Sequence, residues 1–293
     1  MKTLKEIILT PTEQMFSEIQ KEIGNGNTDG TNFLYFPSKS PLILQAHIDT
    51  VRRIIPQLSI ENKIIKSNGI MGADDRAGVY ALLQTYHRTP KAKRPSLLFT
   101  NHEEIGGHGM KKFLKKNPKR TLTHVNLLIA VDRQGANEYV YYNAIHSKVK
   151  DFIKSFGYIE ENGTYSDCQN FTSKSRIPSV NVSCGYYNQH AAAEELHIDE
   201  LDLTISRLID ICQNPLKTLY PVDKQENYRL RDYYYGSDYA YTATERLDKC
   251  AVCDSAATLR RVLDDGFQID VCYNCFQTYY GDNEHSFYDD RRY

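Results

Sequence analysis

The chain has 293 residues, of which 41% are hydrophobic and 25% charged, and its formal net charge is -1. This length is enough for one large domain and one small one. The balanced charge gives no global basic field that would attract nucleic acid or an acidic membrane surface. No apolar run reaches the roughly 18 residues that a membrane span needs.

The N-terminal residues 1–24 mix lysines and glutamates with apolar side chains. This pattern is typical of an amphipathic helix. It differs from a secretion signal, in which an uncharged apolar segment follows a short basic one. We therefore predict a surface helix at the start of the chain.

From there to about residue 215, short buried strands alternate with amphipathic helices. Strands are predicted at residues 33–36, 42–46, 96–100, 126–131 and 179–182, and helices at residues 76–87, 110–117 and 199–213. This alternation predicts an α/β fold, a three-layer sandwich around a mixed, mostly parallel central sheet. Functional sites in such sheets form at the carboxyl ends of the strands.

Polar side chains gather at these strand ends and at the start of the helix at residues 76–87. They are His47 and Asp49, Asp74 and Asp75, Glu103 and Glu104, Asp132, and His190. Each has an ordinary explanation by itself, as a surface histidine, a helix cap, a solvated glutamate pair or a turn aspartate. Their common placement at strand ends predicts a metal site instead.

His47 and Asp49 are two residues apart just beyond a strand, so their side chains project to the same side. A metal-bound imidazole donates its second N–H to a carboxylate, and Asp49 fits that role. Asp74 and Asp75 open a predicted helix, where one aspartate can cap the helix while the other bridges two cations.

Glu103 and Glu104 are neighbours at a strand end, so their side chains diverge. One can bind metal while the other holds the attacking water. Two adjacent carboxylates repel each other at neutral pH unless cations lie close by, so the pair also favours a metal site.

The ordered set of motifs resembles the co-catalytic zinc exopeptidases, which include tripeptide aminopeptidase, bacterial leucyl aminopeptidase, glutamyl-type aminopeptidases, carboxypeptidase G and acetylornithine deacetylase. The resemblance covers about residues 1–213. It rests on residues 42–51, 69–78 and 100–109, on Asp132, and on residues 166–196.

The resemblance implies that one zinc ion is bound by His47, Asp74 and Asp132. It implies that a second is bound by Asp74, Glu104 and His190, so that Asp74 bridges the two ions. Glu103 would then be the general base that acts on a metal-activated water, and Asp49 would orient His47. Zinc suits these ligands, and cobalt or manganese can replace it.

The chain departs from this family in having no room for a lid domain. Only 58 positions separate Asp132 from His190, and only 27 separate His47 from Asp74. Because carboxypeptidases of this group take substrate-carboxylate ligands from such an insert, the sequence favours an aminopeptidase. Asp167 either anchors a substrate ammonium near the rim of the site or caps a helix.

The composition changes after Pro221. We predict a catalytic domain at residues 1–220, a tyrosine-rich linker at residues 221–244, and a zinc-ribbon-like module at residues 245–293. The module carries two CxxC pairs 18 residues apart, Cys250 with Cys253 and Cys272 with Cys275. This spacing predicts one structural zinc ion, and paired CxxC units in an odd total of seven cysteines favour reduced thiols and a cytoplasmic location.

Residues 245–293 contain six Lys or Arg and ten Asp or Glu. This negative balance opposes phosphate binding, so we expect the module to contact protein, a second copy of the chain, or the active site.

The sequence thus predicts a zinc-dependent hydrolase of amide bonds, in first place an aminopeptidase on small peptides. The alternatives are an amidohydrolase or deacylase of a small acylated metabolite or modified nucleotide, and a non-catalytic adaptor that binds a partner through the zinc module. Retention of Glu103 favours an enzyme, since an adaptor would not need a base.

Overall fold

The computed structural model describes residues 2–163, 166–222, 259–262 and 268–271. The chain divides into two units, Met1–Lys224 and Gln225–Tyr293. In the second unit, β13 (Leu259–Val262) and β14 (Gln268–Val271) pair in antiparallel orientation. The four cysteines of the predicted zinc module, and the predicted linker beyond residue 222, lie outside the described residues.

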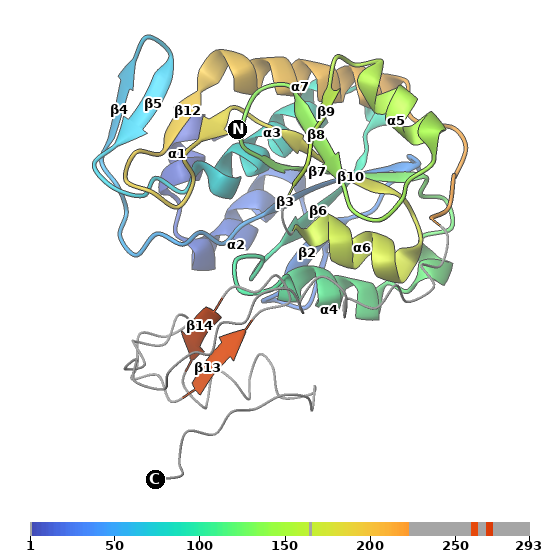
Figure 1. Ribbon diagram of the computed structural model, residues 1–293, viewed down its shortest axis with the longest axis horizontal. Helices are drawn as coiled ribbons and strands as arrows, with labels where there is room; N and C mark the ends of the chain where they lie inside the picture. Colours follow the sequence, from blue (N-terminus) through green and yellow to red (C-terminus); the bar gives the residue numbers. More distant parts are fainter. Residues whose placement is uncertain (1, 164–165, 223–258, 263–267, 272–293) are drawn as a thin grey trace, which may run out of the picture. The chain divides into compact units, whose positions relative to one another are not determined.

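The first unit is built around an eight-stranded mixed sheet with the order β1-β2-β6-β3-β7-β10-β8-β9 (Figure 1). The strands β6, β3, β7 and β10 are mutually parallel. Antiparallel pairs join β1 to β2, β2 to β6 and β8 to β10, whereas β8 and β9 pair in parallel. The strands are β1 (Asn27–Thr28), β2 (Phe33–Phe36), β3 (Leu42–His47), β6 (Ser96–Thr100), β7 (Leu127–Arg133), β8 (Glu138–Tyr141), β9 (Ile159–Glu160) and β10 (Ser179–Ser183).

Helices cover both faces of this sheet. One face packs against α1 (Leu4–Leu9), α2 (Thr12–Ile23), α3 (Ala73–Arg88), α5 (Ser147–Lys154) and α7 (Ile198–Gln213). The other packs against α4 (His108–Lys116) and α6 (Asp167–Ser175), which lie together below the sheet in Figure 1. Two short 3-10 helices, η1 (Lys91–Lys93) and η2 (Lys119–Thr121), complete the helical elements of the described residues.

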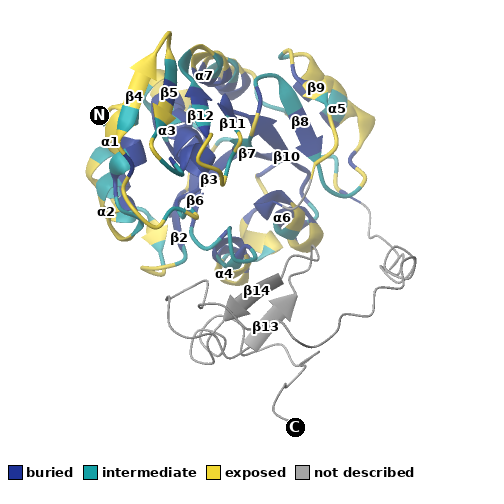
Figure 2. Ribbon diagram, turned by 60° about the vertical axis from the view of Figure 1, so that its left-hand side comes forward, coloured by how far each residue is buried: buried dark blue, intermediate teal, exposed yellow. Residues whose placement is uncertain are grey.

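The alternation of side chains along each strand divides the core between the two faces. In β7, Leu127, Ile129 and Val131 join the larger cluster, whereas Leu128 and Ala130 face α4 and α6. Because successive strand residues point to opposite faces, a sheet covered on both sides needs a continuous apolar run. That requirement explains why the central strands in Figure 2 are buried along almost their whole length.

The N-terminal segment forms two helices where the sequence predicted one. Thr3 caps α1 in a capping box with Glu6. Thr10 then adopts an extended conformation, and Pro11 precedes the first residue of α2. Proline has no N–H to donate and its ring collides with the preceding turn of a helix, so Pro11 can only stand at a helix start.

A second, four-stranded sheet with the order β11-β12-β5-β4 lies beside α3 and α7. Its strands are β4 (Leu58–Glu61), β5 (Ile64–Ser67), β11 (Tyr186–Tyr187) and β12 (Glu195–His197). The hairpin β4–β5 fills the interval between His47 and Asp74, and it was not predicted. None of the helices in the described part of the chain has the length and apolar composition that a membrane crossing needs.

Candidate metal centre

The candidate site lies at the carboxyl ends of the parallel strands. His47 is the last residue of β3, Asp132 lies near the end of β7, and Glu103 and Glu104 follow β6. Asp74 stands at the start of α3, and His190 lies in the loop between β11 and β12. The fold thus brings together all five residues that were expected to bind metal.

Asp74 stands between the two histidines. Its Oδ1 atom lies 3.0 Å from Nε2 of His47, and its Oδ2 atom lies 3.2 Å from Nε2 of His190. Nε2 of His47 is also 3.4 Å from Oδ1 of Asp132, and Nε2 of His190 is 3.1 Å from Oε1 of Glu104. Two groups therefore form, His47–Asp74–Asp132 and Asp74–Glu104–His190, and within each the nearest ligand atoms lie within 4.8 Å of one another.

Burial makes the ionised form of several acids in this site unfavourable. Burial raises the pKa of Asp132 to about 6 and that of Glu104 to about 7, against the opposing effect of nearby histidines. Burial also raises the pKa of Glu103 well above its usual range. Buried carboxylates that repel one another are stabilised by cations. The donor set of imidazole and carboxylate atoms fits zinc at both groups.

The two histidines are held in this acidic surrounding by the same carboxylates. Burial alone would lower the pKa of His47, but Asp132, Asp49 and Asp74 together raise it. Asp74 and Glu104 raise the pKa of His190 to about 10. Both imidazoles therefore lie in a negative field that favours cations.

Asp49 serves both the histidine and the glutamate pair. Nδ1 of His47 is 3.1 Å from the backbone oxygen of Asp49 and 3.5 Å from its Oδ1 atom. The Asp49 carboxylate also accepts hydrogen bonds from the backbone N–H groups of Glu103 and Glu104, both at 3.1 Å. This second contact, which the sequence did not indicate, fixes the turn that carries both glutamates.

Asp75 joins β3 to α3. Its Oδ2 atom accepts a hydrogen bond from the backbone N–H of His47, and its Oδ1 atom accepts one from Gly78, each at 3.0 Å. Because Asp74 and Asp75 have non-helical backbone angles, the bond to Gly78 is a helix cap. Gly78 has to be a glycine, since a Cβ atom there would lie 2.2 Å from both Oδ1 of Asp75 and the backbone oxygen of Val131.

Three further side chains hold the site and were not predicted. Asn181 receives the N–H of Asp132 on Oδ1 at 2.9 Å and donates to its carbonyl at 2.6 Å. The hydroxyl of buried Tyr186 donates to Oδ1 of Asp132 at 3.4 Å. Glu194 accepts hydrogen bonds from the turn that precedes Asp74. Asparagine, tyrosine and glutamate are common in every setting, so no sequence signal distinguishes these three.

Asp167 lies deeper than either sequence interpretation placed it. The cap of α6 is Ser166, and Asp167 is the first residue of the helix, with no exposed surface. Its Oδ2 atom accepts hydrogen bonds from Thr100 at 2.7 Å and Gln45 at 3.2 Å. Asp167 therefore ties β3 and β6 to α6 beneath the site and does not line an open rim.

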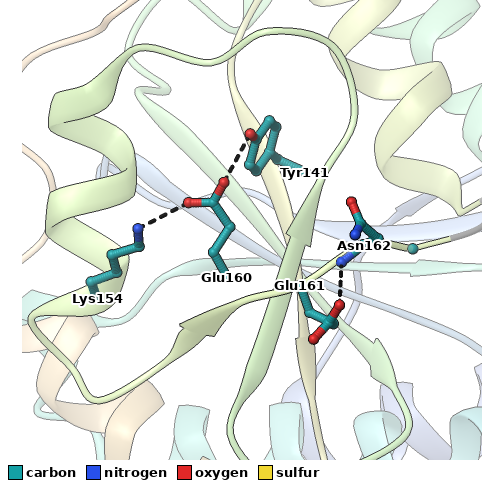
Figure 3. A pocket seen from close by; sticks show the side chains of 6 residues that line it. Tyr141, Lys154, Glu160, Glu161 and Asn162 are labelled. Atoms are coloured by element: carbon teal, nitrogen blue, oxygen red, sulfur yellow. Dashed lines mark hydrogen bonds and ion pairs between the residues drawn. The ribbon is translucent and has the colours of Figure 1, made fainter.

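A separate depression of about 450 Å³ lies near α5 and β9. Figure 3 shows that its polar groups pair with one another, since Lys154 and Tyr141 both reach the carboxylate of Glu160, at 2.9 and 3.0 Å. It shares no residue with the candidate metal centre. It therefore contributes no ligand to that centre.

The fold and the site together define an α/β chain with a candidate dinuclear metal centre, and solved structures share this fold. The aminopeptidase PepT of Bacillus cereus matches with a TM-score of 0.55 at 14% identity, over 72% of this chain and 96% of that one. A tripeptidase of Staphylococcus aureus has a TM-score of 0.55 at 16% identity, over 72% and 96%. The TET1 peptidase of Pyrococcus horikoshii has a TM-score of 0.54 at 14% identity, over 71% of this chain and 98% of that one. At these identities the likeness establishes the fold alone.

The chain belongs to peptidase family M28, which residues 30–197 match. That range contains all seven predicted site residues outside the cysteine module. Among curated relatives, a probable carboxypeptidase of Emericella nidulans is 36% identical over 110 residues, which are 33% of this chain and 25% of the relative. A probable carboxypeptidase of Aspergillus niger is 34% identical over 103 residues, which are 30% of this chain and 24% of the relative. The match spans about a quarter of the length of these relatives.

Proposed function

We propose that the chain is a zinc-dependent peptidase that acts on small peptides, in first place an aminopeptidase. The observation that carries this proposal is the position of Asp74, whose two carboxylate oxygens face two different imidazoles at 3.0 and 3.2 Å. A carboxylate shared in this way suits a bridge between two cations. Membership of a zinc-dependent peptidase family supports the same reading.

His47, Asp74 and Asp132 would hold one zinc ion, and Asp74, Glu104 and His190 the other. When bound, the ions would polarise the scissile carbonyl and increase the acidity of a water molecule. Glu103, which is not needed as a ligand, would accept a proton from that water and return it to the leaving amine. Asp49 would keep both His47 and the backbone of Glu103 in position, through the hydrogen bonds described above.

The direction of cleavage is the finer part of the proposal. The curated relatives are named probable carboxypeptidases, whereas the structural neighbours are named an aminopeptidase and a tripeptidase. We favour an aminopeptidase because the intervals from His47 to Asp74 and from Asp132 to His190 hold only short elements of the catalytic unit. Among the described residues of these intervals, none forms a lid domain that could supply a carboxylate-binding group.

The test is hydrolysis of a dipeptide and tripeptide library in which each peptide is also supplied with its amine acetylated or its carboxylate amidated. An aminopeptidase loses activity on acetylated peptides and keeps it on amidated ones, and a carboxypeptidase does the reverse. Cleavage of acetylated amino acids alone would indicate a deacylase. Activity that resists a zinc chelator, or no activity with two zinc ions bound, would contradict the proposal.

For the remainder of the chain, we propose that Cys250, Cys253, Cys272 and Cys275 bind one structural zinc ion, and that residues 245–293 contact protein. The proposal rests on the spacing of the cysteines. The cysteines of the catalytic unit are free, since Cys168, Cys184 and Cys212 are buried without a disulfide, which supports a cytoplasmic location. Zinc content of three per chain, and a fall by one in a C250S/C253S variant, is the expected result.

A further inference from the structure

Glu194 is a buried acid outside the proposed ligand set. Its side chain is 1% exposed. Its Oε2 atom accepts hydrogen bonds from the backbone N–H groups of Met71 at 2.7 Å and Gly72 at 2.8 Å, and its Oε1 atom accepts one from Asp74 at 3.2 Å. One carboxylate therefore receives three N–H groups of the turn that leads into α3.

The loop that carries His190 is otherwise open to solvent. Asn188, His190 and the three alanines that follow His190 are exposed, and the imidazole of His190 retains 47% of its surface. His190 also has a left-handed backbone, with φ of 64°, which is uncommon for a residue other than glycine. Four positions after His190, Glu194 returns the loop to the interior and is thus its anchor.

The turn at Met71 and Gly72, whose N–H groups bond to Glu194, also contacts other residues. Arg52 donates a hydrogen bond to the carbonyl of Met71 at 2.8 Å and another to the carbonyl of Thr10 at 3.2 Å. Gly72 has φ of 75°, and a Cβ atom there would lie 2.9 Å from a methyl carbon of Thr50. The backbone of the turn is therefore also held by contacts that do not involve Glu194.

We propose that Glu194 is a positioning residue that fastens the His190 loop to the Asp74 turn and so presets the group Asp74–Glu104–His190 for its metal ion. This inference rests on the proposed function for the identity of the metal. The physical reason is that Asp74 and His190 come from separate segments, and in the described structure Glu194 is the side chain that joins the backbones of both. Its two oxygens suit three converging N–H donors, whereas an amide keeps only one acceptor oxygen and would turn its NH2 group toward at least one of them.

The experiment compares E194Q with E195Q in the full chain. Glu195 is the adjacent acid, at the start of β12, partly exposed, and pairs with His197 at 3.1 Å and Lys66 at 3.8 Å, so its variant controls for the loss of one charge at the next position. Zinc affinities are measured by competition with a chelator. We expect E194Q to bind one of its zinc ions about 10–100-fold more weakly, while E195Q and the remaining zinc ions of E194Q match the wild type.

A second readout needs neither metal nor activity. In the metal-free chain, hydrogen exchange of the Met71, Gly72 and Asp74 amides should accelerate in E194Q and stay unchanged in E195Q, because only Glu194 accepts their hydrogen bonds. Thermal unfolding shows whether each variant is folded. If E194Q does not fold, E194D, which keeps the charge and is one methylene shorter, is carried through both measurements with the same expectation.

Wild-type zinc affinity in a folded variant at position 194 would overturn the proposal, even if the three amides exchange faster. Failure of the proposed function has a different signature, because the wild-type chain itself would then lack the pair of zinc ions. In that case, faster hydrogen exchange of the three amides in E194Q, but not in E195Q, would still support the role of Glu194 in joining the loop to the turn. Unchanged exchange would contradict that role.

Discussion

The two halves of the candidate metal centre differ in how the fold holds their residues. In the group His47–Asp74–Asp132, the imidazole of His47 is 1% exposed, and β3 pairs directly with β7 in parallel register. In the group Asp74–Glu104–His190, the imidazole is 47% exposed and its loop belongs to the smaller sheet. The first half, which we call strand-held, thus lies on paired strands of the central sheet, and the second, which we call loop-held, depends on side chains that join loops to one another.

This difference indicates how each half resists distortion. In the first half, strand pairing brings the segments together, and buried side chains complete the hydrogen bonding: Asp75 accepts the backbone N–H of His47, and Asn181 bonds to both backbone groups of Asp132. In the second half, the loops are positioned by the short strands at their ends and by a few buried contacts, here those of Asp49 with the Glu103–Glu104 turn and of Glu194 with the Asp74 turn. We therefore expect the loop-held half to bind its ion less tightly.

The largest effect should come from Asp74, because both halves share it. In D74N the amide keeps the size of the side chain but loses the charge and one acceptor. We expect zinc content to fall by two ions per chain and peptidase activity to fall to background. Metal analysis after gel filtration measures the first, and loss of only one ion would contradict the shared position of Asp74.

Glu103 should separate chemistry from metal binding. In E103Q both halves keep all their ligands, so zinc content should equal that of the wild type. Loss of the base should lower kcat by about 10²–10⁴-fold. Metal analysis and steady-state kinetics on the best peptide of the library provide the measurement. Near-normal kcat would rule out a proton-transfer role for Glu103.

The two histidine variants test the asymmetry of the halves directly. Titration of the wild-type chain with a chelator should release one ion of the pair at a lower chelator concentration than the other. That early step should be missing in H190A. In H47A the more tightly bound ion should be lost instead. Simultaneous release of both ions in the wild type would show that the halves are equivalent.

Glycine substitutions test how closely α3 packs on β7 in the strand-held half. In G78A the new methyl group would meet Asp75 and the backbone of Val131 at 2.2 Å, so the free energy of unfolding should fall by about 1–3 kcal/mol. Gly69 has nothing within 4 Å of an added Cβ atom, which makes G69A the matched control. Denaturant unfolding of the metal-free chains compares the two, and equal stability would contradict the close packing of α3 on β7.

Asp167, which lies beneath the site, should make the stability of the folded chain depend on pH. Burial raises its pKa to about 7, above the value near 3.9 of an unfolded aspartate. The folded chain therefore binds a proton that the unfolded chain has lost between these pH values. Its contribution to stability is fully present below about pH 4 and is lost as the pH rises toward 7.

The measurement is unfolding of the metal-free chain across this range. In D167N, which cannot ionise, the fall in stability between about pH 4 and 7 should be smaller than in the wild type, by an amount on the order of a few kcal/mol. Identical slopes in the two chains would show that Asp167 ionises as freely in the folded state as in the unfolded one.

Much of the architecture could be read from local patterns. The apolar runs at residues 33–36, 42–46 and 96–100 predicted β2, β3 and β6, because a strand covered on both faces must be apolar throughout. The helix expected to start at Arg76 agrees with the cap that Asp75 forms. The split at Pro11 and the hairpin β4–β5 were missed, the second because β4 is short and mostly exposed.

The sequence by itself determined which chemical groups stand at the strand ends, since the alternation of strands and helices dictates that parallel strands end at one edge. Only the tertiary structure decided the orientation of those groups and the hydrogen bonds that hold them. Asp74 turns one oxygen to each histidine, Asp75 reaches back to His47, and Glu194 closes the loop of His190. Contacts between residues as far as 123 positions apart depend on the folded path of the chain, and no local pattern encodes them.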